Sequence, residues 1–106
     1  MGLDPRVQNM MDGDVQAIRD GLADDSVPVR TLAVLYAAKH GLRDGETVRL
    51  LRALKQDETF CFCHEGPRIA NFAAAALHCL GVERYAGDDP CVLWLIERDF
   101  DVLPCE

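Results

Sequence analysis

The chain has 106 residues, of which 49 % are hydrophobic and 27 % are charged, and its formal net charge is −7. This length suits a single domain with a modest core, and this composition is typical of a folded globular protein rather than a disordered one. The acidic charge argues against nucleic acid and membrane as partners, because both attract basic surfaces. No stretch approaches the roughly eighteen uncharged apolar residues that predict a membrane span.

The start of the chain and its cysteines together predict a cytoplasmic protein with reduced thiols. The segment from Met1 to Pro5 lacks the basic start and the apolar run of a secretory signal. Five cysteines without an export signal are not expected to form a disulfide framework. We therefore expect free and largely buried thiols at Cys61, Cys63, Cys79, Cys91 and Cys105.

Two helices are expected near the N-terminus, a short one at about residues 5–11 and a second over residues 14–22. The second has Val15, Ile18 and Leu22 at helical spacing. A longer helix follows, with Ser26 as its N-cap, Pro28 in its first turn and Gly41 as its C-terminal stop. Its apolar face repeats at i, i+3, i+4, i+7, i+8 and i+11 and comprises Val29, Leu32, Ala33, Tyr36, Ala37 and His40.

The second half of the chain repeats this layout. A helix over residues 46–56 is followed by a helix from Ile69 to Gly81, whose spacing matches that of the segment from Val29 to Gly41 at an offset of forty residues throughout. A period of about forty residues with two helices per unit is typical of helical solenoids. Both matched helices are rich in alanine on their other faces, as expected for helices that lie between other elements.

The last predicted helix begins at Asp89-Pro90, an N-cap followed by proline at the first helical position. It runs through an apolar stretch that includes Trp94 to about residue 100. We therefore predict an all-α fold in one domain over residues 1–106, a short right-handed α-α superhelix of about two and a half helical-hairpin units. The units are residues 14–41, 46–81 and 89–100.

The run from Leu22 to Ala33 (LADDSVPVRTLA) closely resembles a HEAT repeat, and so does the alanine-rich helix from Ile69 to Gly81. Over roughly residues 14–98 the chain resembles the HEAT-repeat (armadillo-type) family, as a small single-domain member of bacterial type. The resemblance implies the helical superhelix just described. It also implies a scaffold that binds other proteins rather than an enzyme.

The resemblance further implies a polar ladder between neighbouring units. A turn aspartate, Asp24 or Asp25, and the arginine of the Val-Arg pair, Arg30, would form it. The second unit departs from this pattern, because Ala70 occupies the arginine position and Arg68 lies two residues earlier.

The second unit also carries an insertion of eight residues within the segment 58–67. Insertions in repeat proteins lie on one face, often the binding face. Phe60, Phe62 and His64 are therefore candidate partner contacts.

The same loop suggests a metal site as the alternative function, a metal-binding protein or enzyme centred on Cys61, Cys63 and His64. With His78 or Cys79 as a fourth ligand, these residues could supply a zinc site. The Cys-x-Cys spacing is tighter than the usual Cys-x2-Cys and no second pair follows, so the bound-metal reading is not preferred and no cofactor is expected.

Two further surfaces are candidate partner sites. Arg49 and Arg52 share one face of the predicted helix over residues 46–56 and would form a docking patch for an acidic partner. Trp94 lies in the terminal half-unit, whose apolar face needs a cover and could dimerise. We expect a non-catalytic adaptor, escort or immunity-type protein that binds another protein, and the acidic charge makes a basic partner a good fit.

Overall fold

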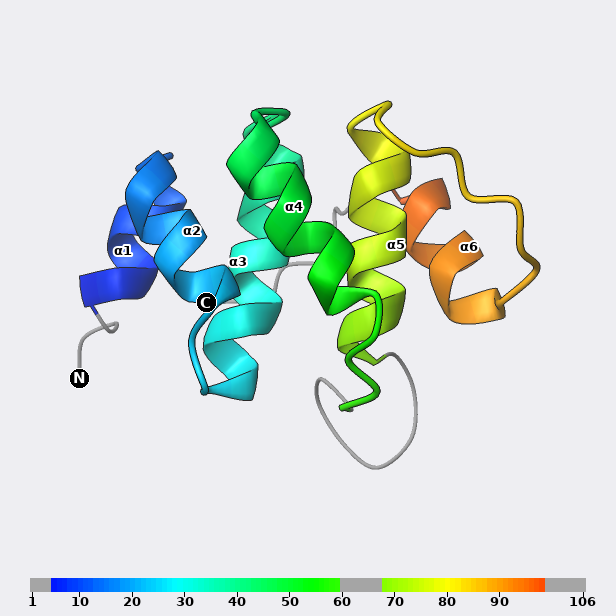
Figure 1. The fold of residues 1–106 in the computed structure, drawn as a ribbon, viewed down its shortest axis with the longest axis horizontal. Coiled ribbons are helices and arrows are strands. Elements are labelled where there is room, and N and C mark those ends of the chain that lie inside the picture. Colours follow the sequence, from blue (N-terminus) through cyan, green and yellow to red (C-terminus); the bar gives the residue numbers. More distant parts are fainter. Residues whose placement is uncertain (1–4, 60–67, 99–106) are drawn as a thin grey trace.

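The computed structural model of the chain describes residues 5–59 and 68–98 (Figure 1). These residues form six α-helices and no β-strand, which confirms the all-α prediction for this part of the chain. In chain order, the helices are α1 (Pro5–Met11), α2 (Val15–Leu22), α3 (Val27–Lys39), α4 (Gly45–Leu54), α5 (Ile69–Cys79) and α6 (Pro90–Glu97). None of these helices is long and apolar enough to cross a membrane.

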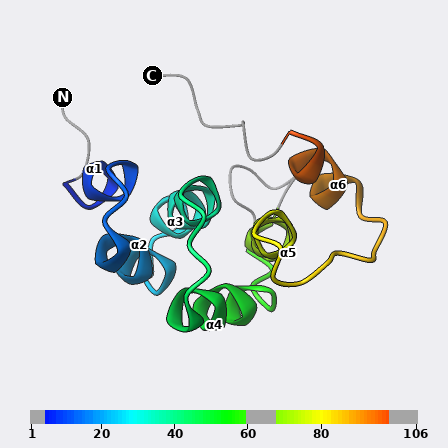
Figure 2. The ribbon, with the colours of Figure 1, turned by 90° about the horizontal axis from the view of Figure 1, so that it is seen from above.

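Five of the helices lie in two rows (Figure 2). The first row contains α1, α3 and α5, and the second row contains α2 and α4. Neighbours within each row touch, since α1 contacts α3, α3 contacts α5, and α2 contacts α4. Helices α3 and α5, the two matched segments, run in the same direction, and α4 runs opposite to them (Figure 1).

Helix α6 packs against α5 on the side away from α4 (Figure 2). In a third helical hairpin, α6 would be the first helix of the unit, as α2 and α4 are, and it would then lie beside α4 in the second row. Residues 81–89 contain no helix, so α6 follows α5 without a second-row helix between them. It begins beside the first turn of α5, where the Asn71 side chain donates a hydrogen bond to Asp89.

The matched helices α3 and α5 end in the same way. Gly41 and Gly81 adopt φ angles of +68° and +74°, the left-handed conformation that glycine tolerates best. In both turns the N–H of the next residue donates to a carbonyl five residues earlier, at 3.0 Å. This is the Schellman pattern of helix C-termini, and it confirms the glycine stops expected from the sequence.

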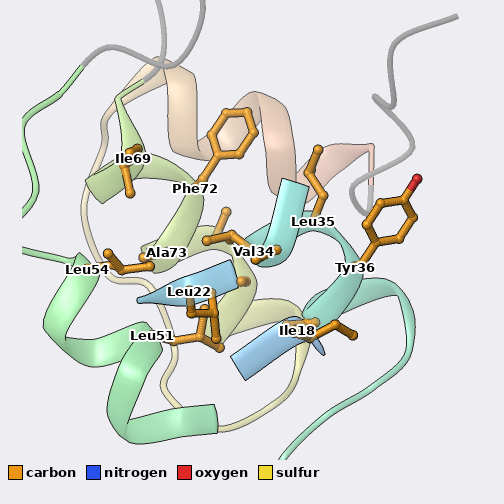
Figure 3. Close-up of a cluster of buried hydrophobic side chains, with 14 of the residues drawn as sticks. Ile18, Leu22, Val34, Leu35, Tyr36, Leu51, Leu54, Ile69, Phe72 and Ala73 are labelled. Atoms are coloured by element: carbon orange, nitrogen blue, oxygen red, sulfur yellow. The ribbon is translucent and has the colours of Figure 1, made fainter. Parts of the chain in front are cut away.

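The core lies between the rows and continues along the first row (Figure 3). Matched positions of α3 and α5 are buried together, as in the pairs Val29 and Ile69, or Ala33 and Ala73. The second row contributes the fully or almost fully buried Ile18, Leu22 and Leu51. Because α3 and α5 contact helices on several sides, the alanines of their other faces are buried or half-buried, as with the buried Ala75 and the half-buried Ala38 and Ala74.

His40 is the position where the expected apolar face is wrong. Its counterpart Leu80 is buried, whereas His40 is exposed. Helix α3 ends at Lys39, so His40 belongs to the capping turn. Its ring stacks on Tyr36 and its Nε2 atom lies 3.2 Å from the carbonyl oxygen of Met11, at the end of α1.

The N-caps predicted from the sequence are present in the structure, together with one that was not predicted. The Ser26 hydroxyl accepts the Val29 N–H, as expected, and Asp89 caps α6. Asp44 caps α4 by accepting the Thr47 N–H at 3.0 Å, a cap that was not predicted from the sequence. Helix α4 ends two residues earlier than predicted, and the expected end of α6 near residue 100 lies outside the described residues.

Candidate binding surface

Arg30 joins the start of α3 to the turn that precedes α5. Its Nη1 atom donates to the backbone carbonyl of Asp24 at 2.9 Å, and its Nε atom lies 3.3 Å from Oδ2 of Asp57. The Arg30 and Asp57 side chains are only 16 % and 21 % exposed. Of the two aspartates expected to accompany Arg30, Asp24 contributes its carbonyl and Asp25 is exposed to solvent. The carboxylate that faces Arg30, Asp57, had not been expected from the sequence.

Asp24 and Asp57 nevertheless occupy equivalent turns. The carboxylate of Asp24 accepts the N–H of Ser26 at 2.8 Å, and that of Asp57 accepts the N–H of Thr59 at 3.0 Å. Both are turns in which an aspartate bonds the backbone two residues ahead. Partial burial raises the pKa of Asp57, but the Thr59 hydrogen bonds and the Arg30 charge outweigh it and hold that pKa below its ordinary value.

The link between α5 and α6 uses an amide in place of a guanidinium. Ala70 stands at the arginine position, but Nδ2 of the adjacent Asn71 donates to Oδ2 of Asp89 at 3.1 Å. The other carboxylate oxygen of Asp89 caps α6. Arg68 turns instead to Glu58 on the surface, at 3.0 Å. The departure seen at Ala70 therefore does not leave α5 and α6 without a polar link.

The basic side chains on and just after α4 (Arg49, Arg52 and Lys55) form ion pairs with acidic side chains of the same chain. Arg49 pairs with Glu46 on the same helix, while Arg52 lies 3.2 Å from Glu83 and Lys55 pairs with the same carboxylate. The Lys55 hydrogen bond and then that of Arg52 lower the pKa of Glu83. Arg49 and Arg52 are exposed, as expected for a docking patch, but their charges already have acidic neighbours.

The predicted loop contacts Phe60, Phe62 and His64, together with Cys61 and Cys63, lie outside the described residues. The fourth ligand considered for a zinc site is described. Nδ1 of His78 accepts the backbone N–H of Tyr85 at 3.1 Å. Within residues 5–59 and 68–98, no three His, Cys, Asp or Glu side chains are grouped to hold a metal ion.

Two of the five cysteines, Cys79 and Cys91, lie in the described part, and both are half-buried. Burial, followed by the neighbouring Asp89 carboxylate, raises the pKa of the Cys91 thiol. A raised pKa keeps the thiol protonated and less reactive, which is the opposite of what a nucleophile needs.

The terminal helix α6 carries the most exposed apolar pair among the described residues. Leu93 and Trp94 are 45 % and 44 % exposed, whereas Val92 and Leu95 are buried on the opposite face. The guanidinium carbon of Arg98 lies 4.4 Å from the Trp94 ring centroid, so the cation covers one face of the indole. Trp94, expected as an anchor from the sequence, is thus accessible on the exposed face of α6.

A second, smaller apolar pair lies at the opposite end of the molecule. Met11 ends α1 and Val15 begins α2, and they are 38 % and 36 % exposed. Val15 had been expected to face the core. It is the first residue of α2 and is exposed, whereas Ile18 and Leu22 further along the helix are buried.

Comparison of the chain with protein-family models, with curated proteins and with solved structures gave no match.

Proposed function

We propose that this chain is a short HEAT-like repeat scaffold of the cytoplasm that binds a basic protein through its α6 edge, defined by Leu93 and Trp94. The observation that carries the proposal is the exposure of this apolar pair on α6, the last helix of the described residues. The chain itself performs no chemistry in this role. Its function is to hold a partner, as an adaptor, an escort or an immunity-type protein does.

The links between helices support the repeat arrangement. Arg30 reaches from α3 to the turn before α5, and Asn71 reaches from α5 to the start of α6. In repeat proteins each unit is stabilised mainly by its immediate neighbours, and such contacts recur at each step. Two rows of helices with matched first-row members at a forty-residue offset fit this architecture (Figure 2).

Exposure of the terminal helix supports its use as a binding surface. A repeat array needs a polar outer face at its ends, because an uncovered apolar edge would otherwise associate. Helix α6 instead presents a leucine and a tryptophan, and tryptophan is strongly enriched among residues that dominate binding energy. A partner on this edge would bury both side chains.

Charge favours a basic protein over a second copy of the chain. Residues 57–106 carry ten acidic and three basic side chains, and residues 1–28 carry six acidic and two basic. Two copies that met through their α6 edges, or end to end, would bring like charges together. A partner rich in lysine and arginine would be attracted instead.

Affinity capture from the source cell with two matched variants tests this function. Trp94→Ala removes the anchor, and Val15→Ala shortens an exposed side chain at the other end of the molecule. We expect the unmodified chain and Val15→Ala to retain one protein with an excess of lysine and arginine, and Trp94→Ala to lose it. Both variants should change the free energy of unfolding little, as surface substitutions usually do.

Three outcomes would contradict the proposal. They are capture of the same basic protein by Trp94→Ala, capture of an acidic protein only, and a stable dimer of the free chain in light scattering. The first would move the binding surface away from α6. The second and third would remove the charge argument on which the choice of partner rests.

A further inference from the structure

The connection between α5 and α6 (residues 80–89) is held against α5 by two side chains of the same helix face. Asn71 and His78 are seven residues apart, about two turns of α5, so they point in a similar direction. Asn71 donates to Oδ2 of Asp89, the last residue of the connection. Nδ1 of His78 accepts the backbone N–H of Tyr85, in the middle of the connection, at 3.1 Å. The contact at His78 therefore requires an imidazole whose Nδ1 atom carries no proton.

The side chain of Tyr85 also fixes the end of this connection. Its hydroxyl oxygen accepts the backbone N–H of Asp89 at 3.0 Å, and Asp89 caps α6 by accepting the Cys91 N–H. A Cβ added to Gly87 would lie 2.5 Å from the Tyr85 hydroxyl oxygen, so the backbone passes directly beside the phenol. The position of the Tyr85 backbone thus depends on His78, and the start of α6 depends on the Tyr85 side chain.

We propose that His78 and Tyr85 form a pH-sensitive latch. While His78 is neutral, the latch holds the connection against α5, and when His78 takes up a proton it releases the connection and the start of α6. Histidine in its ordinary state changes charge between about pH 8 and about pH 5. The added proton lies on Nδ1 and points at the Tyr85 N–H, so two donors face each other and the hydrogen bond is lost. The latch goes beyond the proposed function, because it needs no partner protein.

The charged groups on the segments around this end of α5 do not hold the His78 ring. Glu83, in the connection, pairs with Arg52 and Lys55. The other charged side chains of the adjoining segments are exposed to solvent, and they are Lys39, Arg84, Asp88, Glu97 and Arg98. Among the described residues, the Tyr85 N–H is the hydrogen-bond partner of His78, and no carboxylate pairs with its ring. The protonated ring would therefore gain no ion pair in place of the lost hydrogen bond.

Amide hydrogen exchange, measured by NMR between about pH 7.5 and about pH 5.5, tests the latch. We expect the protection of the Tyr85 and Asp89 amides, corrected for the intrinsic exchange rates, to fall together by about fivefold, as for the loss of a typical hydrogen bond. Amides in the middle of α3 should keep their protection. The hydrogen bonds from Lys55 and then Arg52 lower the pKa of Glu83, so that carboxylate keeps its charge over this range and its ion pairs do not contribute.

Matched variants assign the pH response to His78. In His78→Asn, the amide oxygen takes the place of Nδ1 and accepts the Tyr85 N–H at any pH, so protection at Tyr85 should persist and no longer fall with pH. His40→Asn and His64→Asn change the other two histidines of the chain and should leave the response as it is. In Tyr85→Phe, the amide at position 85 should still respond, whereas the Asp89 amide should lose its protection throughout the range.

The ring nitrogens of His78 provide a second measurement on the unmodified chain. Their chemical shifts at about pH 8 should place the ring proton on Nε2, and a proton on Nδ1 would overturn the latch because Nδ1 could not then accept. An unchanged pH response in His78→Asn would also overturn it, as would constant protection of the Tyr85 amide over the whole range. A fall in protection at Tyr85 alone, with Asp89 still protected, would overturn the coupling to α6.

Discussion

Helices α3 and α5 share their buried apolar positions and their C-terminal turns, and they differ in the polar contact that links each to the next segment. Both have buried apolar positions in matched register and a glycine with positive φ in a Schellman turn. They differ in their polar links, because α3 uses the charged pair of Arg30 and Asp57 whereas α5 uses the neutral amide of Asn71 on Asp89.

The polar links differ between α3 and α5 while the buried apolar positions match, which indicates that the packing of these helices depends mainly on apolar burial. Burial of an apolar side chain contributes about 1.5–3 kcal/mol, whereas a single hydrogen bond contributes a net 0.5–1.5 kcal/mol in typical cases. Replacing one type of link by another therefore costs little as long as the half-buried carboxylate keeps a polar partner. Loss of the apolar register would cost much more.

The largest effect is expected from Phe72→Ala in α5. Phe72 is 1 % exposed, and truncation of a buried phenylalanine costs about 3–5 kcal/mol. Its counterpart forty residues earlier, Leu32, is half-buried, so Leu32→Ala should cost about half as much or less. Urea unfolding followed by circular dichroism measures both.

Since Phe72→Ala could leave too little folded protein to measure, Phe72→Leu provides a milder variant with an expected loss of about 1–2 kcal/mol. Equal losses for Leu32→Ala and Phe72→Ala would contradict the deeper burial of Phe72 relative to Leu32.

The polar links are expected to rank next. Arg30→Gln should cost about 1–3 kcal/mol, because it leaves the largely buried Asp57 carboxylate without its cation. Asn71→Ala should cost about 1 kcal/mol, the value of a neutral donor. A double-mutant cycle of Arg30→Gln with Asp57→Asn isolates the coupling between the two side chains.

The same cycle for Asn71→Ala with Asp89→Asn gives the matched value for the second link. Asparagine is also a good N-cap, so this change keeps the start of α6. A larger coupling for Asn71 than for Arg30 would reverse the proposed order of the two links.

The helices and their ends were predictable from the sequence because they depend on local rules. Ser26, Gly41, Gly81 and Asp89-Pro90 act within one turn of the chain, and each lies where the sequence predicted it. Hydrophobic spacing is equally local, and apart from the exposed His40 it placed the apolar faces of α3 and α5 correctly.

The links were less predictable because they depend on which segments meet in space. Asp57 was not expected as the partner of Arg30, and Glu83 was not expected beside Arg52 and Lys55. Those pairs are 27 to 31 residues apart, and the insertion before α5 hides the equivalence of Asp57 with Asp24. Both aspartates accept the N–H two residues ahead, so the two turns have the same hydrogen-bond pattern.

Alanine substitutions at Gly41 and Gly81 test whether the C-terminal turns of α3 and α5 are equivalent. An added Cβ would meet no atom within 4 Å at either Gly41 or Gly81, so only backbone strain opposes alanine there. We expect Gly41→Ala and Gly81→Ala to cost about 1–2 kcal/mol each and to agree closely. Gly45→Ala in α4 has similar space and no positive φ, and it should be neutral or stabilising. A large difference between Gly41→Ala and Gly81→Ala would mean that the two turns are not equivalent.

The smallest expected effect concerns a charged link in the second row, where Arg19 of α2 lies 2.6 Å from Asp44, the N-cap of α4. The Thr47 N–H hydrogen bond, followed by the hydrogen bond and charge of Arg19, lowers the pKa of Asp44 from 3.8 to about 2 despite some opposing burial. A carboxylate with a lowered pKa stabilises the fold fully above its ordinary pKa, and this contribution is lost as pH falls through about 4 toward 2.

Asp44→Asn keeps a good N-cap and removes only the charge, so it should cost about 0.5 kcal/mol at pH 7, in keeping with the partial exposure of both partners. The difference from the unmodified chain should shrink between pH 4 and pH 2, where Asp44 itself becomes protonated. Asp14 caps α2 in the same way but forms no ion pair with any described residue, so Asp14→Asn is the matched control. Thermal unfolding at several pH values gives both curves, and a constant difference for Asp44→Asn down to pH 2 would show that its charge does not join the rows.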